Sequence, residues 1–471
     1  MGLLRWVFLI FFLSIIQGYS QDKPRVLVLT DIENEPDDAQ SLVRFLLYTN
    51  HYDVEGLVAT TSTHLRNRTA ADKIKEIVSA YGQVRSNLLK HESGFPSESY
   101  LQARIKSGLP VYGMEGVGEG KDSEGSEWLI QVVDKEDERP LWVPVWGGAN
   151  VLAQALWKVQ QTRTPRELEV FVSKIRVYAI SDQDDSALWI RNTFPDLFYI
   201  VSPGENYIFS TWTGISGEGH RNYATGADEE IVTNPWLREH IIEDHGPLGE
   251  KYPEVAYIME GDSPSFMNLI NNGLSDPEHP EWGGWGGRYD LYQPRFLPYR
   301  NSDLHQPETR PIWTDAQDEV IGKDGKKYIN NQATIWRWRD AYQHDFAARM
   351  DWCLQSYEAA NHPPVVEAQA VKDLVMSPGD ELIIDASGSH DPDQDELSYQ
   401  WFVYTEAGSF WRWTWTKPLI LEGDKSSQLT LHLNEKVGLS HPQTLHLILA
   451  VTDNGSPSLT RYGRYIINLM P

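Results

Sequence analysis

Cysteine is almost absent from this sequence, and its scarcity excludes two ways of stabilising a fold. The chain has one cysteine, Cys353, in 471 residues, so no disulfide can form within it. A structural zinc site built from several cysteines is excluded for the same reason. The fold must therefore rely on a hydrophobic core, and 41% hydrophobic residues over this length are enough to build one.

Positive charge is scarce as well. The chain carries 41 Lys and Arg against 67 Asp and Glu, which gives a formal net charge of −26. Nucleic acid and anionic membrane surfaces repel a chain of this charge. Neutral sugars and cations remain as ligand classes, and we expect no nucleic-acid partner.

Long apolar runs are missing after the first twenty residues. Residues 6–16 are apolar, Arg5 precedes them and small residues follow at 18–20, which is the pattern of a signal peptide. We expect residues 1–20 to be this signal, cleaved near Ser20. The mature protein would be secreted or periplasmic in a bacterium, because an exported chain without disulfides fits that compartment. A membrane anchor is the alternative, but the run is shorter than the ~20 residues that a span needs.

Residues 21–361 alternate short apolar runs with stretches of helical period. This pattern predicts an α/β domain with an open, mostly parallel sheet and helices on both faces. In such sheets ligands bind at the carboxyl ends of the strands, so the loops after the runs are candidate sites. The four clearest runs, each followed by its helical stretch, are 26–29 with 39–48, 54–59 with 70–81, 141–145 with 151–159, and 175–180 with 187–194.

The pattern changes at Pro363 and Pro364, where two prolines end the helical stretch. Beyond them, short strand-like runs separated by turn residues predict a small all-β sandwich over residues 362–471. The sequence D-A-S-G-S-H-D-P-D-Q-D at 385–395 resembles the signature loop of Ig-like domains of the polycystic-kidney-disease (PKD) type. The second domain is therefore expected to be Ig/PKD-like.

The densest polar cluster follows the first apolar run directly. Five carboxylates fall within eight residues there, at Asp31, Glu33, Glu35, Asp37 and Asp38. Carboxylates this close repel one another unless a cation lies among them or some are protonated. Oxygen ligands of this kind suit Ca²⁺. The alternative is a solvated loop in which an aspartate caps the next helix.

At this point the sequence resembles a known family. T-D-I-E-N-E-P-D-D at 30–38 looks like the aspartate cluster of nucleoside hydrolases, and W-G-G-A-N at 146–150 is similar to their second signature. The closer resemblance is to exported nucleoside-hydrolase-like proteins described as cellulose-binding. It extends through residues 180–185, 259–266 and 283–289 and through the carboxy-terminal β-domain, so it covers nearly the whole mature chain.

The resemblance implies roles for particular residues. Asp31, Asp38 and Asp262 would be ligands of Ca²⁺, and Ala149 would add its backbone carbonyl. Asp37 would be the catalytic carboxylate that activates water. A metal-activated water would then attack the anomeric carbon of a sugar while an oxocarbenium-like transition state develops.

The sequence also departs from the nucleoside hydrolase pattern. Glu33 stands where those enzymes carry an aspartate, and Glu35 and Pro36 replace a glycine and an apolar residue. The Glu-Phe-Asn segment that clamps ribose has only a faint echo, in G-E-N at 204–206. These departures put ribose recognition in doubt more than metal binding.

Further polar residues are candidates for substrate contact or for the leaving-group acid. Asp182 and Asp185 lie in a second acidic loop, although capping of the helix that starts near residue 186 is an equal alternative. The candidate substrate-binding residues are Glu35, Asn150, Asp182, Asp185, Trp282 and Trp285, and the candidate acids are His64, His220 and His245.

Tryptophans offer flat faces on which sugar rings could stack. Trp282 and Trp285 lie in a glycine-rich segment, where the alternative is packing over the core. Trp336 and Trp338 are expected to pack in the core. Trp411, Trp413 and Trp415 alternate and would share one face of a strand, which could bind a polysaccharide or, as we favour, pack against the first domain.

Two functions fit these observations. The first is a secreted hydrolase of N- or O-glycosidic bonds that acts on a nucleoside-like or plant-type glycoside through Ca²⁺ and the Asp cluster. The second is a non-catalytic protein that binds cellulose or another cell-wall polysaccharide on the same fold. The aspartates at 37 and 38 favour the hydrolase, whereas the missing ribose clamp favours a sugar other than ribose. A scaffold whose β-domain mediates assembly is a third, weaker alternative.

Overall fold

The structure is a computed structural model of the full chain. It describes residues 23–204, 207–216, 226–294, 308–367, 374–410 and 418–471. The predicted signal peptide, His220 and the alternating tryptophans at 411, 413 and 415 lie outside the described residues, so the predictions for them stay predictions.

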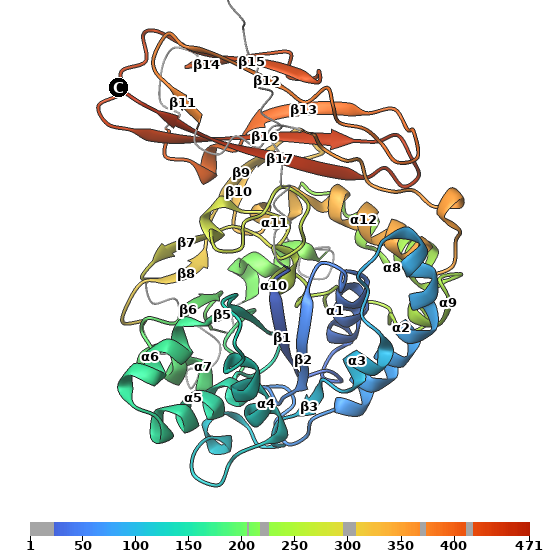
Figure 1. The fold of residues 1–471 in the computed structure, drawn as a ribbon, viewed down its shortest axis with the longest axis vertical. Helices are drawn as coiled ribbons and strands as arrows, with labels where there is room; N and C mark the ends of the chain where they lie inside the picture. The colour runs from blue at the N-terminus through green and yellow to red at the C-terminus, as the bar shows by residue number, and fades with distance from the viewer. Residues whose placement is uncertain (1–22, 205–206, 217–225, 295–307, 368–373, 411–417) are drawn as a thin grey trace, which may run out of the picture.

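One large sheet forms the centre of the first domain (Figure 1). In the described residues its strand order is β3-β2-β1-β4-β5-β6-β8-β7, and every neighbouring pair is parallel except β7 with β8. The strand β1 is buried along its whole length, as expected for a strand covered on both faces. The strands are β1 Arg25–Thr30, β2 Asp53–Ala59, β3 Ile105–Ser107, β4 Leu141–Val145, β5 Ile175–Ala179, β6 Phe198–Val201, β7 Tyr289–Tyr292 and β8 Ile312–Asp315, with a separate hairpin of β9 Asp318–Ile321 and β10 Lys327–Asn330.

Helices cover both faces of this sheet, which confirms the predicted α/β architecture. One core joins side chains of β1 to α1, α2 and α12, and a second joins the opposite side chains of β1 to α4, α5 and α7. All four predicted strand–helix pairs are present. The α-helices are α1 Pro36–Leu47, α2 Ala71–His91, α3 Glu98–Gln102, α4 Glu124–Val133, α5 Asn150–Thr162, α6 Pro165–Ser173, α7 Ser186–Thr193, α8 Asn234–Leu237, α9 Gly246–Gly249, α10 Pro264–Met267, α11 Ala333–Trp336 and α12 Arg339–Asp351.

Shorter helical turns connect these elements. They are 3₁₀ turns except for η6, which is a π-helix. Their bounds are η1 Gly113–Gly116, η2 Tyr207–Phe209, η3 Thr211–Ile215, η5 Glu230–Val232, η6 Arg238–Ile242, η7 Pro280–Trp282, η9 Tyr357–Ala359 and η10 Thr405–Ala407.

The carboxy-terminal part of the chain is a two-layer β-sandwich. One layer has the order β11-β17-β16-β13 and the other β12-β15-β14, and a third core lies between them. The two long strands β16 and β17 pair over ten residues each. The bounds are β11 Leu374–Met376, β12 Glu381–Asp385, β13 Ser398–Val403, β14 Leu419–Glu422, β15 Gln428–Leu433, β16 Gln443–Thr452 and β17 Thr460–Leu469.

The sandwich packs on the first domain through its four-stranded layer (Figure 1). Tyr404, Ile448 and Tyr462 belong to the core of the first domain rather than to that of the sandwich. Asp345 of α12 is buried and accepts a hydrogen bond from Arg461 of β17 at 2.6 Å. The two domains therefore share a core and a buried ion pair.

A second buried ion network, here called the Asp318 group, crosses the same interface. The Asp318 carboxylate is fully buried and accepts bonds from Arg288 at 2.8 Å, Arg337 at 2.7 Å and the Tyr404 hydroxyl at 2.6 Å. Because two guanidinium groups surround it, the pKa of Asp318 is held below its usual value despite burial. The β-domain contributes one of the three donors.

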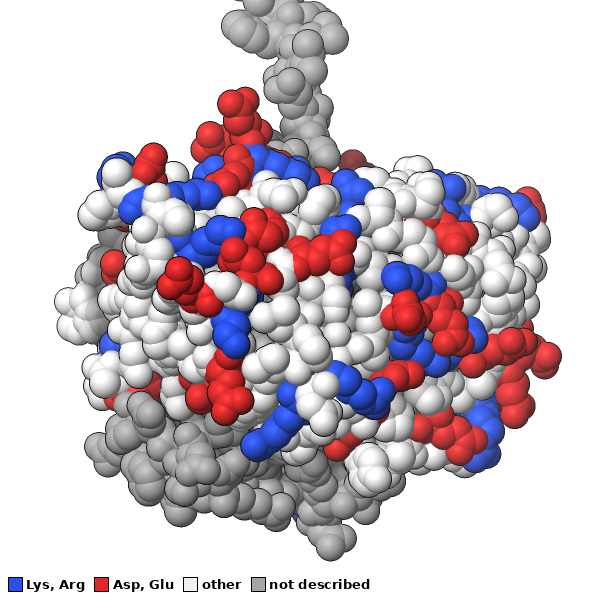
Figure 2. Space-filling view, turned by 90° about the horizontal axis from the view of Figure 1, so that it is seen from below, with Lys and Arg blue, Asp and Glu red and all other residues white. Residues whose placement is uncertain are grey.

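Charged side chains of both signs lie on the surface of the molecule. On the face seen in Figure 2, acidic and basic side chains are interspersed and form no basic patch there. Among the described residues, no helix is long and apolar enough to cross a bilayer.

Candidate functional site

The acidic loop lies at the carboxyl end of β1, between the neighbouring strands β2 and β4. Glu35 is the residue that precedes α1, and it makes no side-chain capping bond. Pro36 starts the helix, a position that suits proline because its missing N–H has no helical partner there. Asp37 and Asp38 therefore fall in the first turn of α1, where both side chains are buried.

A distant loop brings a third carboxylate to this turn. Asp262 lies just before α10, and one carboxylate oxygen from each of Asp37, Asp38 and Asp262 lies within 4.8 Å of the other two. Asp262 is held by its own backbone, since its carbonyl accepts bonds from the amide and the hydroxyl of Ser265. These residues are separated by more than 220 positions in the sequence, yet the resemblance had predicted that Asp262 closes the site.

Glycines allow the loops to approach the carboxylates closely. A Cβ placed at Gly147, after β4, would lie 2.6 Å from Asp31 Oδ1. A Cβ at Gly261 would lie 2.8 Å from Asp37 Oδ2 and 3.0 Å from the ring of Trp212. Any side chain at these positions would displace the carboxylates, so the glycines are needed for the site to form.

Burial and mutual repulsion dominate the electrostatics of the acidic cluster, meaning Asp31, Asp37, Asp38 and Asp262. Burial raises the pKa of Asp31 to about 6 and that of Asp37 to about 8. Burial and then the neighbouring carboxylates raise the pKa values of Asp38 and Asp262 well above the usual range. Glu35, which is partly exposed, adds further repulsion to all four.

The cluster is not neutralised by the described residues. Neither Asp31 Oδ2 nor Asp262 Oδ2 has a hydrogen-bond partner, although both atoms are buried. No ion pair of the described residues reaches any of the four carboxylates. By contrast, the nearby Glu260 is paired with Arg44 and accepts a bond from Tyr252 at 2.7 Å. The possible ligand atoms of the cluster are all oxygens, and no described cationic side chain compensates their charge. Such a group of ligands fits a hard cation such as Ca²⁺.

Ala149 and Asn150 lie at the start of α5. The Ala149 carbonyl accepts the amide of Ala153, and its role as a metal ligand stays a prediction. The Asn150 side chain accepts a bond from Thr60 and donates to the Thr61 hydroxyl at 3.0 Å and to a backbone carbonyl at 2.8 Å. Its amide is buried and its donors are used, so Asn150 connects loops, and its role in substrate binding stays a prediction.

The second acidic loop also differs from expectation. Asp182 is buried and pairs with Arg191 at 2.7 and 3.0 Å, so its charge is compensated within the fold and it is not a substrate contact. Asp185 is exposed and accepts the amide of Met114 at 2.8 Å; its role stays a prediction. It precedes α7 without a side-chain capping bond.

Asp184 was not among the predicted site residues. It is completely buried, its Oδ2 has no partner, and a Cβ at Gly148 would lie 2.4 Å from that atom. Burial raises the pKa of Asp184 to about 6. The acidic pattern at 182–185 indicated a polar loop, but not which aspartate would keep a buried oxygen without a partner.

The two tryptophans of the glycine-rich segment differ: Trp285 follows the packing alternative, whereas sugar contact by Trp282 stays a prediction. Trp285 is 0% exposed, and its ring packs edge-on against Tyr342 and Tyr462, so it is part of the domain interface and cannot stack on a sugar. Trp282 is stacked on His279 with ring centroids 4.0 Å apart, which occupies one of its faces. The glycine-rich segment is therefore a packing element.

The histidines were proposed as leaving-group acids. His245 lies before α9 with its ring 3.4 Å from Asp351, so it is engaged in a contact with α12. His64 lies in the loop after β2, and its amide bonds to Ser62. The acid stays unassigned.

Comparisons with known proteins place this geometry in context. The family described as cellulose-binding Sde182, nucleoside hydrolase-like domain, matches residues 25–289, and the family described as cellulose-binding protein Sde0182, C-terminal domain, matches residues 381–469. No curated protein matches the chain.

Among solved structures, a nucleoside hydrolase-related hypothetical protein from Saccharophagus degradans, described as associated with carbohydrate metabolism, is 36% identical. The match covers 95% of this chain and 100% of that one, with a TM-score of 0.79. The effector protein XOO4466 is 10% identical over 71% of this chain and 95% of that one, with a TM-score of 0.36 that is too low to support any inference.

Proposed function

The chain belongs to the family of cellulose-binding proteins with a nucleoside hydrolase-like domain, and from this membership we propose that it is a Ca²⁺-dependent hydrolase of glycosidic bonds. The proposed substrate is a nucleoside-like or plant-type glycoside with an N- or O-glycosidic bond. The observation that supports the proposal most is the buried convergence of Asp37, Asp38 and Asp262 without a compensating charge among the described residues.

The residues present fit a calcium ion. Asp38 and Asp262 would hold it, and Asp31 and the Ala149 carbonyl are the further proposed ligands. An unpaired buried carboxylate is costly, so the free oxygens of Asp31 and Asp262 would each gain a partner. Oxygen ligands of this type are what Ca²⁺ prefers, and water or substrate oxygens would complete its coordination.

The chemistry would divide between these groups. When bound, Ca²⁺ supplies Lewis acidity that lowers the pKa of a water molecule at the site. Asp37 would take the proton of the attacking water at its carboxylate. The negative charge of Glu35 and of the remaining carboxylates would stabilise the positive charge that develops at the anomeric carbon.

Binding without turnover is the second candidate, and one observation favours it. Glu33 stands where nucleoside hydrolases carry an aspartate, but it is exposed and pairs with Arg68 at 3.0 Å. The matching families are described as cellulose-binding. On this candidate function, the chain would bind a cell-wall polysaccharide and keep the acidic cluster for structure. Either function would operate outside the cytoplasm, in line with the signal peptide expected at residues 1–20.

The decisive experiment is an activity screen with a matched pair of variants. Release of reducing sugar or free base from nucleosides, aryl glycosides and plant polysaccharides is measured with Ca²⁺ and with a chelator. Asp37→Asn removes the proposed base, and Asp72→Asn removes a carboxylate that is 95% exposed on α2. Turnover that requires Ca²⁺, persists in Asp72→Asn and disappears in Asp37→Asn is expected. Turnover that survives in Asp37→Asn would exclude its role as base, and no turnover on any substrate would favour binding alone.

A further inference from the structure

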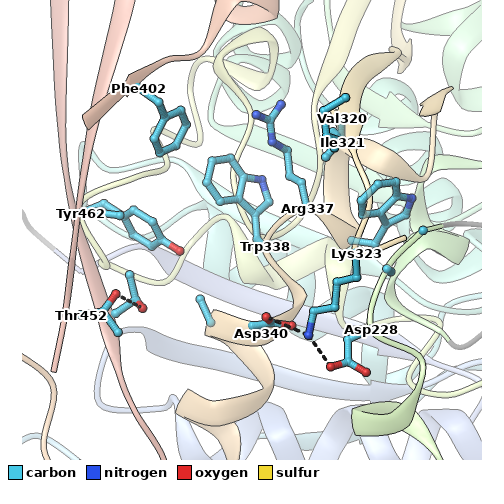
Figure 3. Close-up of a pocket in the computed structure, with 16 residues that line it drawn as sticks. Asp228, Val320, Ile321, Lys323, Arg337, Trp338, Asp340, Phe402, Thr452 and Tyr462 are labelled. Atoms are coloured by element: carbon cyan, nitrogen blue, oxygen red, sulfur yellow. Dashed lines mark hydrogen bonds and ion pairs between the residues drawn. The ribbon is translucent and has the colours of Figure 1, made fainter. Parts of the chain in front are cut away.

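A cleft of about 400 Å³ lies at the seam between the two domains and is lined by residues other than the acidic cluster (Figure 3). On one side are the β9–β10 hairpin and the start of α12, and on the other are β13, β16 and β17. The volume is in the range of small-molecule sites. Ile321, on the hairpin, is 63% exposed beside it, so the cleft opens to solvent.

Aromatic rings from both domains form one wall. The ring of Trp338 lies 6.2 Å from that of Phe402 and 5.7 Å from that of Tyr462, measured between centroids. Trp338 and Tyr462 are buried, whereas Phe402 is half-buried and borders the cleft. Aromatic surface of this kind packs on the apolar faces of pyranose rings.

Polar groups lie on both sides of the cleft (Figure 3). On the side of the first domain, the Lys323 ammonium pairs with Asp228 and lies 3.2 Å from Asp340. On the side of the sandwich, the hydroxyls of Thr452 and Thr460 are hydrogen-bonded to each other at 2.8 Å. Because two aspartates share one ammonium, the excess negative charge disfavours an anionic ligand, whereas a neutral ligand with many hydroxyls could bond to the carboxylates, the ammonium and the threonines.

We propose that this interdomain cleft binds a neutral β-glucan chain, and that it does so separately from the acidic cluster. The proposal rests on the carbohydrate-binding part of the proposed function and assigns it to a site. The half-buried ring of Phe402 and the polar groups on both sides of the cleft match the two kinds of surface that a pyranose chain presents.

The cleft and the acidic cluster lie on two sides of one segment. Arg339 donates to the carbonyl of Asp228, which lines the cleft, at 3.0 Å, and to the carbonyl of Gly214 at 2.9 Å. Trp212, two residues before Gly214, lies beside Gly261 and Asp37. Buried contacts therefore connect the cleft with the acidic cluster, and the two sites share no residue.

The test measures binding of cellohexaose to the full chain by isothermal titration calorimetry in the presence of Ca²⁺. Ala450→Trp fills the cleft from β16, and Phe402→Ala removes an aromatic face. Ile383→Ala alters a 57% exposed apolar residue of β12, which is in the other layer of the sandwich, as the matched control. Lys323→Ala, at an exposed position, replaces Ala450→Trp if that variant does not fold.

Wild type and the Ile383→Ala control should bind equally. Phe402→Ala should raise Kd about tenfold, the effect of one aromatic contact, and Ala450→Trp should abolish binding at unchanged melting temperature. No binding by wild type, or wild-type affinity in both Phe402→Ala and the filled variant, would overturn the proposal.

Failure of the hydrolase proposal gives a different result. Absence of turnover with binding that Ala450→Trp abolishes would reject the hydrolase and support the cleft. Binding lost in Asp37→Asn but kept in Ala450→Trp would place the sugar in the acidic cluster and reject the cleft. Adenosine binding that depends on Phe402 while cellohexaose does not bind would assign the cleft to another ligand class.

Discussion

The acidic cluster and the Asp318 group both bury carboxylates, but only the second contains its own cations. Asp318 is surrounded by Arg288 and Arg337, and its pKa is lowered. Asp37 is equally enclosed, but its neighbours are carboxylates, and its pKa is raised to about 8. Burial alone therefore does not indicate the role of an acidic side chain. The charge of the neighbouring side chains does.

The comparison also separates structure from function. A paired carboxylate such as Asp345, whose pKa Arg461 and Arg349 hold near 2, is complete within the chain. A group of unpaired carboxylates is complete only with a ligand from outside. The two groups should therefore respond differently to mutation, to removal of Ca²⁺ and to pH.

The largest effect is expected from breaking the paired group. Asp318→Asn removes the buried carboxylate that Arg288 and Arg337 share, leaving Asp290 as the close partner of Arg288, and should lower the free energy of unfolding by about 3–5 kcal/mol. Urea unfolding of the variant measures the loss, with Asp72→Asn, which removes an exposed ion pair, as a control that should not change stability measurably. Equal stability of the two variants would contradict the importance of the Asp318 group.

Removing Ca²⁺ should destabilise the protein through the unpaired cluster. A cation present at 100 to 1,000 times its Kd stabilises the native state by about 3–4 kcal/mol, so chelation should lower the melting temperature. Asp262→Asn should make the melting temperature independent of Ca²⁺. An unchanged melt in a sample shown by elemental analysis to be metal-free would refute the calcium site.

The two kinds of carboxylate should respond to pH in opposite directions. Acids with a raised native pKa, such as Asp31 at about 6 and Asp37 at about 8, stabilise the metal-free protein below pH 4, and this contribution is lost as pH rises to about 8. Asp345, with its pKa near 2, stabilises above pH 4 and loses that contribution as pH falls towards 2.

Urea unfolding with a chelator should therefore show lower stability at pH 8 than at pH 5. A difference of several kcal/mol is expected, since Asp37 with a pKa of about 8 stays protonated over most of this range and each pH unit corresponds to about 1.4 kcal/mol. Excess Ca²⁺ should remove most of this difference. A metal-free protein that is as stable at pH 8 as at pH 5 would argue against repulsion in the cluster.

The smallest expected effect is a change in stability whose sign depends on whether Ca²⁺ is present. Asp38→Asn keeps an oxygen that can accept the Thr30 hydroxyl but removes one negative charge. It should stabilise the metal-free protein by on the order of 1 kcal/mol and destabilise the protein in Ca²⁺. Thermal melts of the variant and wild type with and without Ca²⁺ would reveal the crossover, and a loss of stability in both conditions would contradict it.

The sequence predicted well those features that depend on nearby residues. The strands β1, β2, β4 and β5 and the helices after them follow from local hydrophobic period. The acidic loop followed from its position after the first strand, and Asp262 from the family resemblance. The strands β7 to β10 have four residues each, too few for a clear alternation, and were not predicted.

The sequence was less informative about residues whose surroundings are set by packing between distant parts of the chain. Trp285 looked like an exposed ring in a flexible glycine-rich turn. Its glycines instead permit close packing, since a Cβ at Gly286 would lie 2.4 Å from the carbonyl of Pro264 and one at Gly284 would lie 2.0 Å from the Ser275 hydroxyl. The partners of the Asn150 side chain lie 39 to 90 positions away, so its paired state could not be foreseen, whereas Arg191, the partner of Asp182, is only nine positions further along the chain.

The position of Tyr404 has a consequence for protein engineering. Its hydroxyl belongs to the β-domain but serves an aspartate of the other domain. A β-domain excised as an affinity tag would expose an aromatic face that was built for burial, and the remaining hydrolase-like part would keep two arginines and an aspartate arranged for a third donor. The two domains therefore complete each other's buried contacts, and a fusion protein would have to carry both.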